Sequence, residues 1–132
     1  MKVSIEKQSD GTYIAYNTTG DMVQLIGTGD TVKDAKEDFF NSVEEMKGSY
    51  IGRGASVPVE LSEPVDFNFD ISSLFEYYSM FNVSALGRYL GINPGLMRQY
   101  KKGDTPISDA QLEKIESGIH RLAHELASLS LV

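Results

Sequence analysis

Alternation of apolar and polar residues near the start of the chain predicts a small antiparallel sheet. Val3 and Ile5 are separated by polar residues, which is the period of a half-buried strand at residues 2–7. A turn at Asp10-Gly11 leads to a second strand at residues 12–16, and turn-forming residues at 17–21 lead to a third at 22–26. Three short strands with short connections favour an antiparallel meander that has one face to be covered.

The next segment has the period of a helix. Thr31 is a good N-cap, and Asp34 follows three residues later, close to the capping-box pattern. Apolar residues then recur at helical spacing as far as Gly48, at Val32, Ala35, Phe39, Val43 and Met46. We expect this helix to lie on the sheet. Its other face is rich in acidic residues, and such charge runs are more often a solvated face than a binding surface.

The middle of the chain predicts a fourth strand and a linker. Residues 57–61 read V-P-V-E-L, and because proline cannot donate to the ladder, Pro58 indicates either an edge strand or the start of a strand. Residues 62–70 are acidic and lack a long apolar period, so the linker between two domains is expected there. From Ile71 a helical apolar stripe resumes, which predicts a helix at the start of a four- or five-helix bundle.

Residues 82–103 predict two short helices joined by a tight turn. Leu86 and Leu90 lie on one face of the first helix, and Gly87 leaves room for a second helix to cross closely. Asn93 can cap the second helix, Pro94 suits its first position, and Gly103 ends it.

The second of these helices has an apolar and a polar face. Met97 and Tyr100 lie three residues apart and are expected to point inward, so the polar residues between and around them face outward. These residue types contact DNA. We predict Arg98 and Gln99 at base edges, with Asn93 and Gly95 near the backbone or a base at the helix start. The cations predicted to serve phosphates are Arg88, Lys101 and Lys102.

The last helix has the clearest start signal in the chain. Ser108 and Gln111 form a capping box, and Ile107 can pack on Leu112 as a hydrophobic staple. Apolar residues then alternate three and four apart, at Leu112, Ile115, Ile119, Leu122, Leu126 and Leu129. Such a stripe can cover the bundle or pair with a second copy. DNA binding favours a homodimer or a higher homo-oligomer, because regulators of this size dock as pairs on two half-sites.

Charge separates the chain into two halves. Residues 1–81 hold 6 basic and 14 acidic side chains, a net charge of −8, whereas residues 82–132 hold 6 basic and 5 acidic, a net charge of +1. The second half can therefore present cations to DNA despite the overall charge of −7. The acidic half predicts a basic partner.

Composition limits the chemistry of the chain. It holds no cysteine, which excludes disulfides and cysteine-ligated zinc, and its start lacks the apolar core of a signal peptide, so a cytoplasmic protein is expected. His120 and His124 lie four apart without a third histidine or cysteine, so we expect no metal and no cofactor. We also expect no enzyme, because Asp10, Asp21 and Asp30 fall in predicted turns rather than side by side on strands.

Two motifs resemble known families. The run L-G-I-N-x-x-x-M-x-x-Y-x-x-G at residues 90–103 resembles the helix-turn-helix of lambda-repressor and Cro-like regulators. The β-β-β-α-β order, with G-D-T at residues 29–31 and Ala35 in the following helix, resembles the N-terminal domain of HicB-type antitoxins, which is similar to part of a ribonuclease H fold.

Together these patterns predict an α+β protein with a HicB-like domain at residues 1–65 and an all-α helix-turn-helix domain at residues 66–132. The resemblance implies an antitoxin that neutralises a small basic HicA-type mRNA-cleaving toxin and represses its own operon by binding operator DNA. The alternative is a stand-alone transcriptional regulator whose N-terminal domain senses a ligand or only dimerises.

Overall fold

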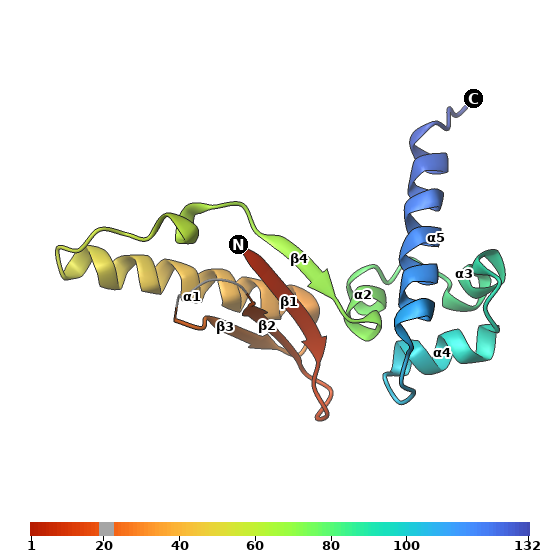
Figure 1. The fold of residues 1–132 in the computed structure, drawn as a ribbon, viewed down its shortest axis with the longest axis horizontal. Coiled ribbons are helices and arrows are strands. Elements are labelled where there is room, and N and C mark those ends of the chain that lie inside the picture. Colours follow the sequence, from red (N-terminus) through yellow and green to blue (C-terminus); the bar gives the residue numbers. More distant parts are fainter. Residues whose placement is uncertain (19–22) are drawn as a thin grey trace. The chain divides into compact units, whose positions relative to one another are not determined.

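The computed structural model describes residues 1–18 and 23–132. Within these residues it is a mixed α+β structure with one four-stranded sheet and five α-helices (Figure 1). The chain divides into two compact units, Met1–Met80 (unit 1) and Phe81–Val132 (unit 2). None of the helices in the described part of the chain combines the length and the hydropathy that a bilayer crossing requires.

The sheet belongs to unit 1 and has the strand order β3-β2-β1-β4. Its strands are β1 (Lys2–Lys7), β2 (Tyr13–Asn17), β3 (Ile26–Gly29) and β4 (Asp66–Phe69). β2 pairs antiparallel with both β1 and β3, as the predicted meander requires, and β4 pairs parallel to β1. The sheet is therefore mixed rather than purely antiparallel.

The third strand begins later than predicted. Residues 23–25 precede β3, while Met22 and most of the predicted turn at 17–21 lie outside the described residues. Asn17 explains part of the difference, because its side-chain Oδ1 accepts a hydrogen bond of 2.7 Å from the backbone of Leu25, which holds this segment without a ladder. Gly27 and Gly29, which weaken a strand pattern, stand inside β3.

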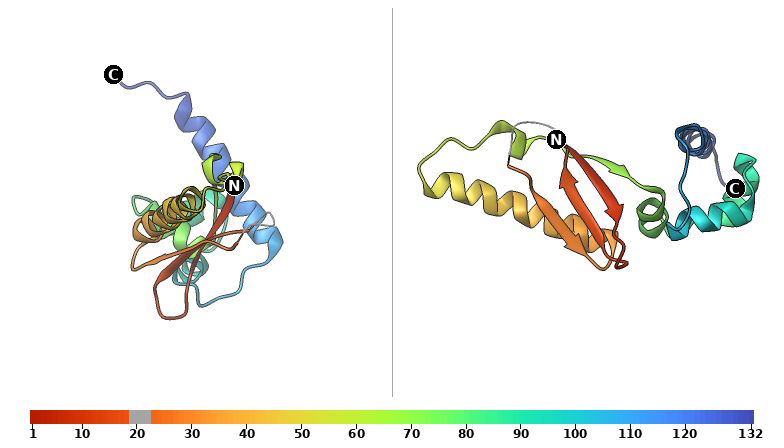
Figure 2. Two further views of the ribbon diagram at one scale, coloured as in Figure 1. Left: turned by 90° about the vertical axis from the view of Figure 1, so that its left-hand side faces the viewer. Right: turned by 60° about the horizontal axis from the view of Figure 1, so that its bottom comes forward.

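Helix α1 (Val32–Gly52) covers one face of the sheet, as predicted (Figures 1 and 2). The Thr31 side chain accepts a 3.1 Å hydrogen bond from the backbone of Asp34. The core lies between the helix and the sheet, where Val32, Ala35, Phe39 and Val43 meet residues of β1 and β2 that include Val3, Ile5, Tyr13 and Ala15. The helix continues past Gly48, the predicted end, and stops before Gly54, which takes the left-handed conformation at φ 69°.

The predicted fourth strand at residues 57–61 is wrong. Its place is taken by a loop and a short 3-10 helix, η1 (Val59–Ser62), whose Leu61 is buried in the core. The fourth strand is β4, inside the segment predicted as a linker. Backbone hydrogen bonds from Asp66 to Met1 (2.9 Å) and from Asp70 to Ile5 (3.0 Å) fix it beside β1.

The helix that follows, α2 (Ile71–Tyr77), belongs to unit 1 rather than to the helical bundle. Asp70 joins it to the sheet, because its carboxylate caps α2 by accepting from Ser73 N and also accepts a 2.9 Å hydrogen bond from Lys7 N. Glu76 accepts from the backbone of Val32 at the start of α1. The units therefore divide after residue 80, fifteen residues later than the predicted boundary at 65.

Unit 2 contains α3 (Val83–Leu90), α4 (Pro94–Lys102) and α5 (Asp109–Ala127). All three predicted helices are present, and Ser108 caps α5 by accepting from Gln111 N at 3.2 Å. The buried side chains of this unit are Val83, Leu86, Leu90, Ile92, Met97, Tyr100 and Ile115. They place α4 against α3, and α3 against the first half of α5.

Candidate nucleic-acid interface

The close crossing of α3 and α4 depends on Gly87. A Cβ atom at this position would lie 2.8 Å from Met97 Cγ and 3.0 Å from the backbone oxygen of Ile92. Gly91 ends α3 in the left-handed conformation at φ 73°, which glycine adopts without strain. The three residues between the helices thus make the tight turn predicted from the sequence.

Asn93 fixes the start of α4. Its Oδ1 accepts hydrogen bonds from Gly95 N at 2.8 Å and Leu96 N at 3.2 Å, and Pro94 occupies the first position of the helix. Because the side-chain oxygen is used in capping, a direct contact of Asn93 with a base has to use its amide nitrogen. Gly95 follows on this first turn and is half-buried.

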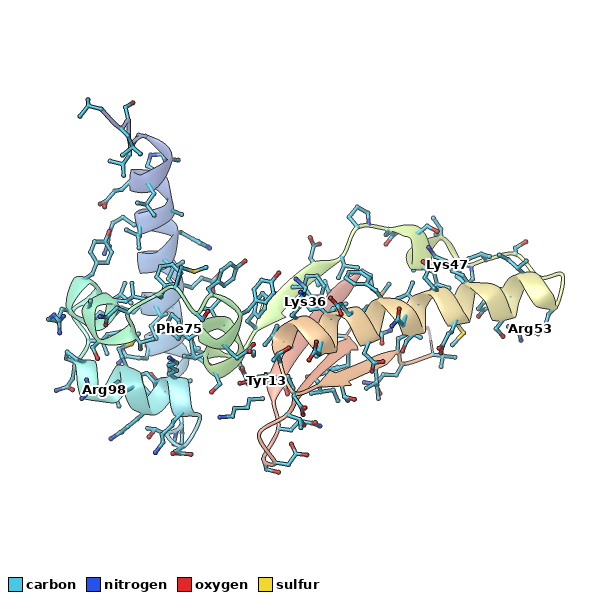
Figure 3. All side chains as sticks on the ribbon, turned by 180° about the vertical axis from the view of Figure 1, so that it is seen from behind. Tyr13, Lys36, Lys47, Arg53, Phe75 and Arg98 are labelled. Atoms are coloured by element: carbon cyan, nitrogen blue, oxygen red, sulfur yellow. The ribbon has the colours of Figure 1, made fainter. Side chains whose placement is uncertain are left out.

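Helix α4 exposes the polar face that the sequence predicts. Met97 is fully buried and Tyr100 is buried beside it, which fixes the rotation of the helix. Arg98, Gln99 and Lys101 are exposed, as is Lys102 on the last turn (Figure 3 labels Arg98). The structure therefore brings four of the predicted DNA-contacting residues together on one short helix.

Two of these side chains are oriented by hydroxyl groups that the sequence analysis did not identify. Arg98 Nη1 donates a 2.8 Å hydrogen bond to Ser84 Oγ on α3. Thr105 Oγ1 donates to Gln99 Oε1 at 3.2 Å. Ser84 lies fourteen residues before Arg98, so no local spacing could reveal the contact. Both contacts restrict rotamers of residues predicted to contact bases.

The remaining predicted cations lie at helix ends. Arg88 is exposed on the last turn of α3. Lys101 and Lys102 end α4, and Lys102 Nζ lies 3.9 Å from Asp104 Oδ2. A cation at a helix C-terminus also interacts favourably with the partial negative charge there.

Two further cations of unit 2 come from α5. Lys114 Nζ donates to the backbone oxygen of Gly91 at 3.3 Å, which satisfies a carbonyl at the end of α3. The guanidinium of Arg121 lies 5.2 Å from the Tyr89 ring centroid, and its Nε donates to the Tyr89 hydroxyl at 3.4 Å. This hydrogen bond raises the pKa of Arg121. Both cations have a structural contact within unit 2.

His120 and His124 lie on exposed positions of α5. In residues 1–18 and 23–132, no group of three or more histidine, cysteine, aspartate or glutamate side chains is arranged to hold a metal ion.

Comparison of the chain with models of protein families, with curated proteins and with solved structures gives no match.

Proposed function

We propose that the protein is a binding protein of the antitoxin type, in which unit 2 binds operator DNA through a helix-turn-helix and unit 1 neutralises a small basic toxin in the cytoplasm. The observation that carries the proposal is the exposed side of α4, where Arg98, Gln99 and Lys102 face away from the buried Met97 and Tyr100 and Lys101 is exposed beside them. A short helix with buried apolar anchors and an exposed face of this chemistry suits the major groove.

The side chains of α4 divide into two roles in this proposal. Arg98, oriented by Ser84, and Gln99, oriented by Thr105, contact base edges. Arg88, Lys101 and Lys102 contact phosphates, and Asn93 and Gly95 bring the start of α4 close to the backbone or a base. Base contacts provide specificity, whereas phosphate contacts add affinity that depends on salt.

A binding assay separates these roles. With DNA from upstream of the protein's own gene, Arg98→Ala is expected to lose about 1–3 kcal/mol and to relax specificity. Lys101→Ala is expected to weaken binding to operator and random DNA alike and to reduce the salt slope by about one unit. Lys33→Ala, an exposed lysine of unit 1, is the control and should change neither. Equal losses from Arg98→Ala and Lys101→Ala on both DNAs would contradict the assigned roles.

Pairing of two copies through α5 would give the two-fold symmetry that half-sites require. The first half of α5 is occupied, because Ile115 is buried and a Cβ on Gly118 would lie 1.9 Å from Leu90 Cδ2. Beyond this contact the apolar stripe continues on α5 to Leu126, which is 53% exposed, and the predicted stripe position Leu129, 65% exposed, lies after the helix ends at Ala127. We expect Leu126→Glu to convert a dimer into a monomer in sedimentation, and a wild-type monomer at micromolar concentration would contradict the pairing.

The toxin part of the proposal follows from the resemblance and from the charge of unit 1, which holds 6 basic and 14 acidic side chains. A HicA-type toxin is a small basic nuclease that cleaves mRNA, so opposite charges would steer the two proteins together. Co-expression with the neighbouring genes tests this. A small basic protein that stays bound in fixed ratio and stops growth when expressed alone is expected. Elution of this chain alone, still binding its own upstream DNA, would instead favour a stand-alone regulator.

A further inference from the structure

The two edges of the sheet in unit 1 differ in how their backbone groups are used. At the β3 edge, α1 supplies partners for the groups that point outward. Asp38 Oδ2 accepts a 2.8 Å hydrogen bond from Thr28 N, and Ser42 Oγ donates a 2.9 Å hydrogen bond to the backbone oxygen of Ile26. Edge strands that are blocked in this way cannot pair with another chain.

The β4 edge has no such protection in the described residues. Asp66 and Asp70 direct their backbone N–H groups to β1, and backbone groups of successive residues in a strand point to opposite sides. The N–H and C=O groups of Phe67 and Phe69 therefore point away from β1. No hydrogen bond from elsewhere in residues 1–18 or 23–132 reaches these four groups, and β1 is the single strand paired with β4.

Five aromatic rings, two of them half-buried and three exposed, lie beside this edge. They come from α1, β4 and the end of α2, and their centroids follow one another at 6.0 to 6.4 Å. We call them the aromatic ridge, and they are Phe40, Phe67, Phe69, Tyr77 and Tyr78. Phe40, Tyr77 and Tyr78 are 42%, 36% and 39% exposed, which is unusual for rings that only fill a core.

The ridge already binds one cation. Lys36 Nζ lies 4.3 Å from the ring centroids of both Phe67 and Tyr77, and it donates a 3.3 Å hydrogen bond to the Tyr77 hydroxyl (Figure 3 labels Lys36). These contacts hold Tyr77 against the edge strand. They also show that the ring faces accept positive charge, which is the chemistry of an arginine or lysine from another protein.

We infer that the outer edge of β4 is a docking site for an extended segment of a basic protein, which adds as a fifth strand to the sheet. The inference rests on the proposed function, in which unit 1 binds a basic partner. The side chains of such a segment would alternate between two environments, because successive side chains of an added strand face opposite sides of the sheet. On the α1 side it would meet the aromatic ridge, and on the other side Asp66 and Asn68, which are exposed.

The charge of unit 1 favours a basic segment over a second copy of the chain at this edge. Two copies of unit 1 would bring together two units with a net charge of −8 each, which repel one another. A basic segment would instead be attracted by Asp66, on the side of the sheet away from α1, and by the net negative charge of unit 1. The docking site is therefore for a partner of opposite charge.

A peptide experiment on the whole protein tests the inference without the partner. The probe is a short blocked peptide of alternating valine and arginine. Two controls have glutamate in place of arginine, or methyl groups on every backbone amide. We expect the arginine peptide alone to bind, more weakly as salt rises, and to slow hydrogen exchange at the Phe67 and Phe69 amides. Absence of binding, or protection at Thr28 with none at Phe67, would overturn the inference.

A pair of variants isolates the backbone group. Phe67→Pro and Phe67→Val both remove the ring, but the proline variant alone removes the outward N–H, and proline is tolerated where an edge N–H faces solvent. We expect Phe67→Pro to bind the arginine peptide about tenfold more weakly than Phe67→Val. Equal affinity of the two folded variants would overturn the inference. Should the proline variant fail to fold, the exchange data on the unmodified protein decide the question.

The same variants separate this inference from the proposed function. Suppose that no peptide binds and that a basic toxin from a neighbouring gene co-purifies equally well with both Phe67 variants. This result would refute the docking site at the β4 edge and would not contradict the antitoxin proposal. Peptide binding at β4 without any co-purifying basic protein would refute the antitoxin proposal and support the docking site at the β4 edge.

Discussion

The two units differ in the sequence distance over which their contacts are made. In unit 1, β1 pairs with β4 more than sixty residues later, as in the pair Lys2↔Asp66, and Asp70 bonds to Lys7 N. In unit 2 the helices begin and end on local signals, with Asn82, Asn93 and Ser108 as caps. Unit 1 therefore depends on long-range pairing, whereas much of unit 2 is determined by neighbouring residues.

The two units also differ in their charge and in the groups that they expose. Unit 1 concentrates the acidic residues around a sheet with an open edge, and unit 2 places exposed cations on a short helix with buried anchors. The difference teaches that one chain can carry an acidic surface and a locally cationic surface when each surface is supported by its own core. We therefore expect a change that unfolds one core to leave the other unit folded.

The largest effect is expected at Gly27, where α1 lies directly on β3. A Cβ atom there would lie 2.1 Å from the backbone nitrogen of Phe39 and 2.5 Å from the backbone oxygen of Ala35. Because backbone atoms cannot move aside cheaply, Gly27→Val should destabilise unit 1 by more than about 3 kcal/mol. Chemical denaturation followed by NMR should show loss of the sheet signals while those of α3 to α5 persist.

Gly48→Ala is the matched control for this variant. Nothing lies within 4 Å of a Cβ at Gly48, which is exposed within α1. Replacing a helical glycine by alanine should stabilise unit 1 by about 0.5–1 kcal/mol. Simultaneous unfolding of both units in Gly27→Val would contradict the independence of the two cores.

A smaller effect, confined to unit 2, is expected at Gly118. An added Cβ would lie 1.9 Å from Leu90 Cδ2, which is the end of a side chain and can move. Gly118→Ala should therefore cost about 1–3 kcal/mol, and combination with Leu90→Ala should give less than the sum of the two losses. Thermal unfolding of the single and double variants measures this coupling. Ser117→Ala, at the exposed neighbour, should lose no stability, and a loss equal to that of Gly118→Ala would exclude crowding as the cause.

The comparison also explains which parts of the fold could be predicted from the sequence. Helices α3, α4 and α5 were predictable because their caps, Pro94 and the terminal glycines act within a few residues. Strand β4 was missed because D-F-N-F-D is too short to be distinguished from a linker, and the partner that makes it a strand is β1. Because α2 directly follows β4, the pairing of β4 with β1 also places α2 in unit 1.

The candidate site shows the same limit. Burial of Met97 and Tyr100 follows from their spacing, so the exposed face of α4 was predictable. The hydroxyl groups of Ser84 and Thr105 that orient Arg98 and Gln99 were not, because they depend on the crossing of α3 and α4 and on the loop after α4. Sequence patterns therefore predicted which residues of α4 are exposed, and the structure added the hydrogen bonds that hold Arg98 and Gln99.

A local signal can be tested at Asn93. Its Oδ1 accepts from two backbone N–H groups at the start of α4. Asn93→Ala should reduce the stability of unit 2 by about 1 kcal/mol and leave unit 1 unchanged, whereas Asn93→Ser should restore most of the loss. Urea unfolding of the three proteins, monitored separately in each unit by NMR, measures the difference. Equal stability of the alanine and serine variants would contradict the capping role.

The smallest effect concerns one ionisable pair on the acidic unit. The Tyr16 hydroxyl donates a 2.8 Å hydrogen bond to Glu6 Oε1 on the neighbouring strand, and this bond raises the pKa of Tyr16 above its usual value. A raised pKa means that the folded state favours the protonated phenol. The associated stability is fully present below the ordinary phenol pKa of about 10, and it is lost as the pH rises through the higher folded value.

Glu6→Gln should sharpen this assignment, because it removes the charge and keeps the shape of the side chain. We expect the Tyr16 ring signals to titrate at lower pH in the variant than in the unmodified protein, with the aromatic signals of unit 2 unchanged. The effect is small since the pair is exposed, and salt should reduce it. Identical titration of Tyr16 in both proteins would show that the strand pair β1–β2 holds the two side chains near each other without coupling them.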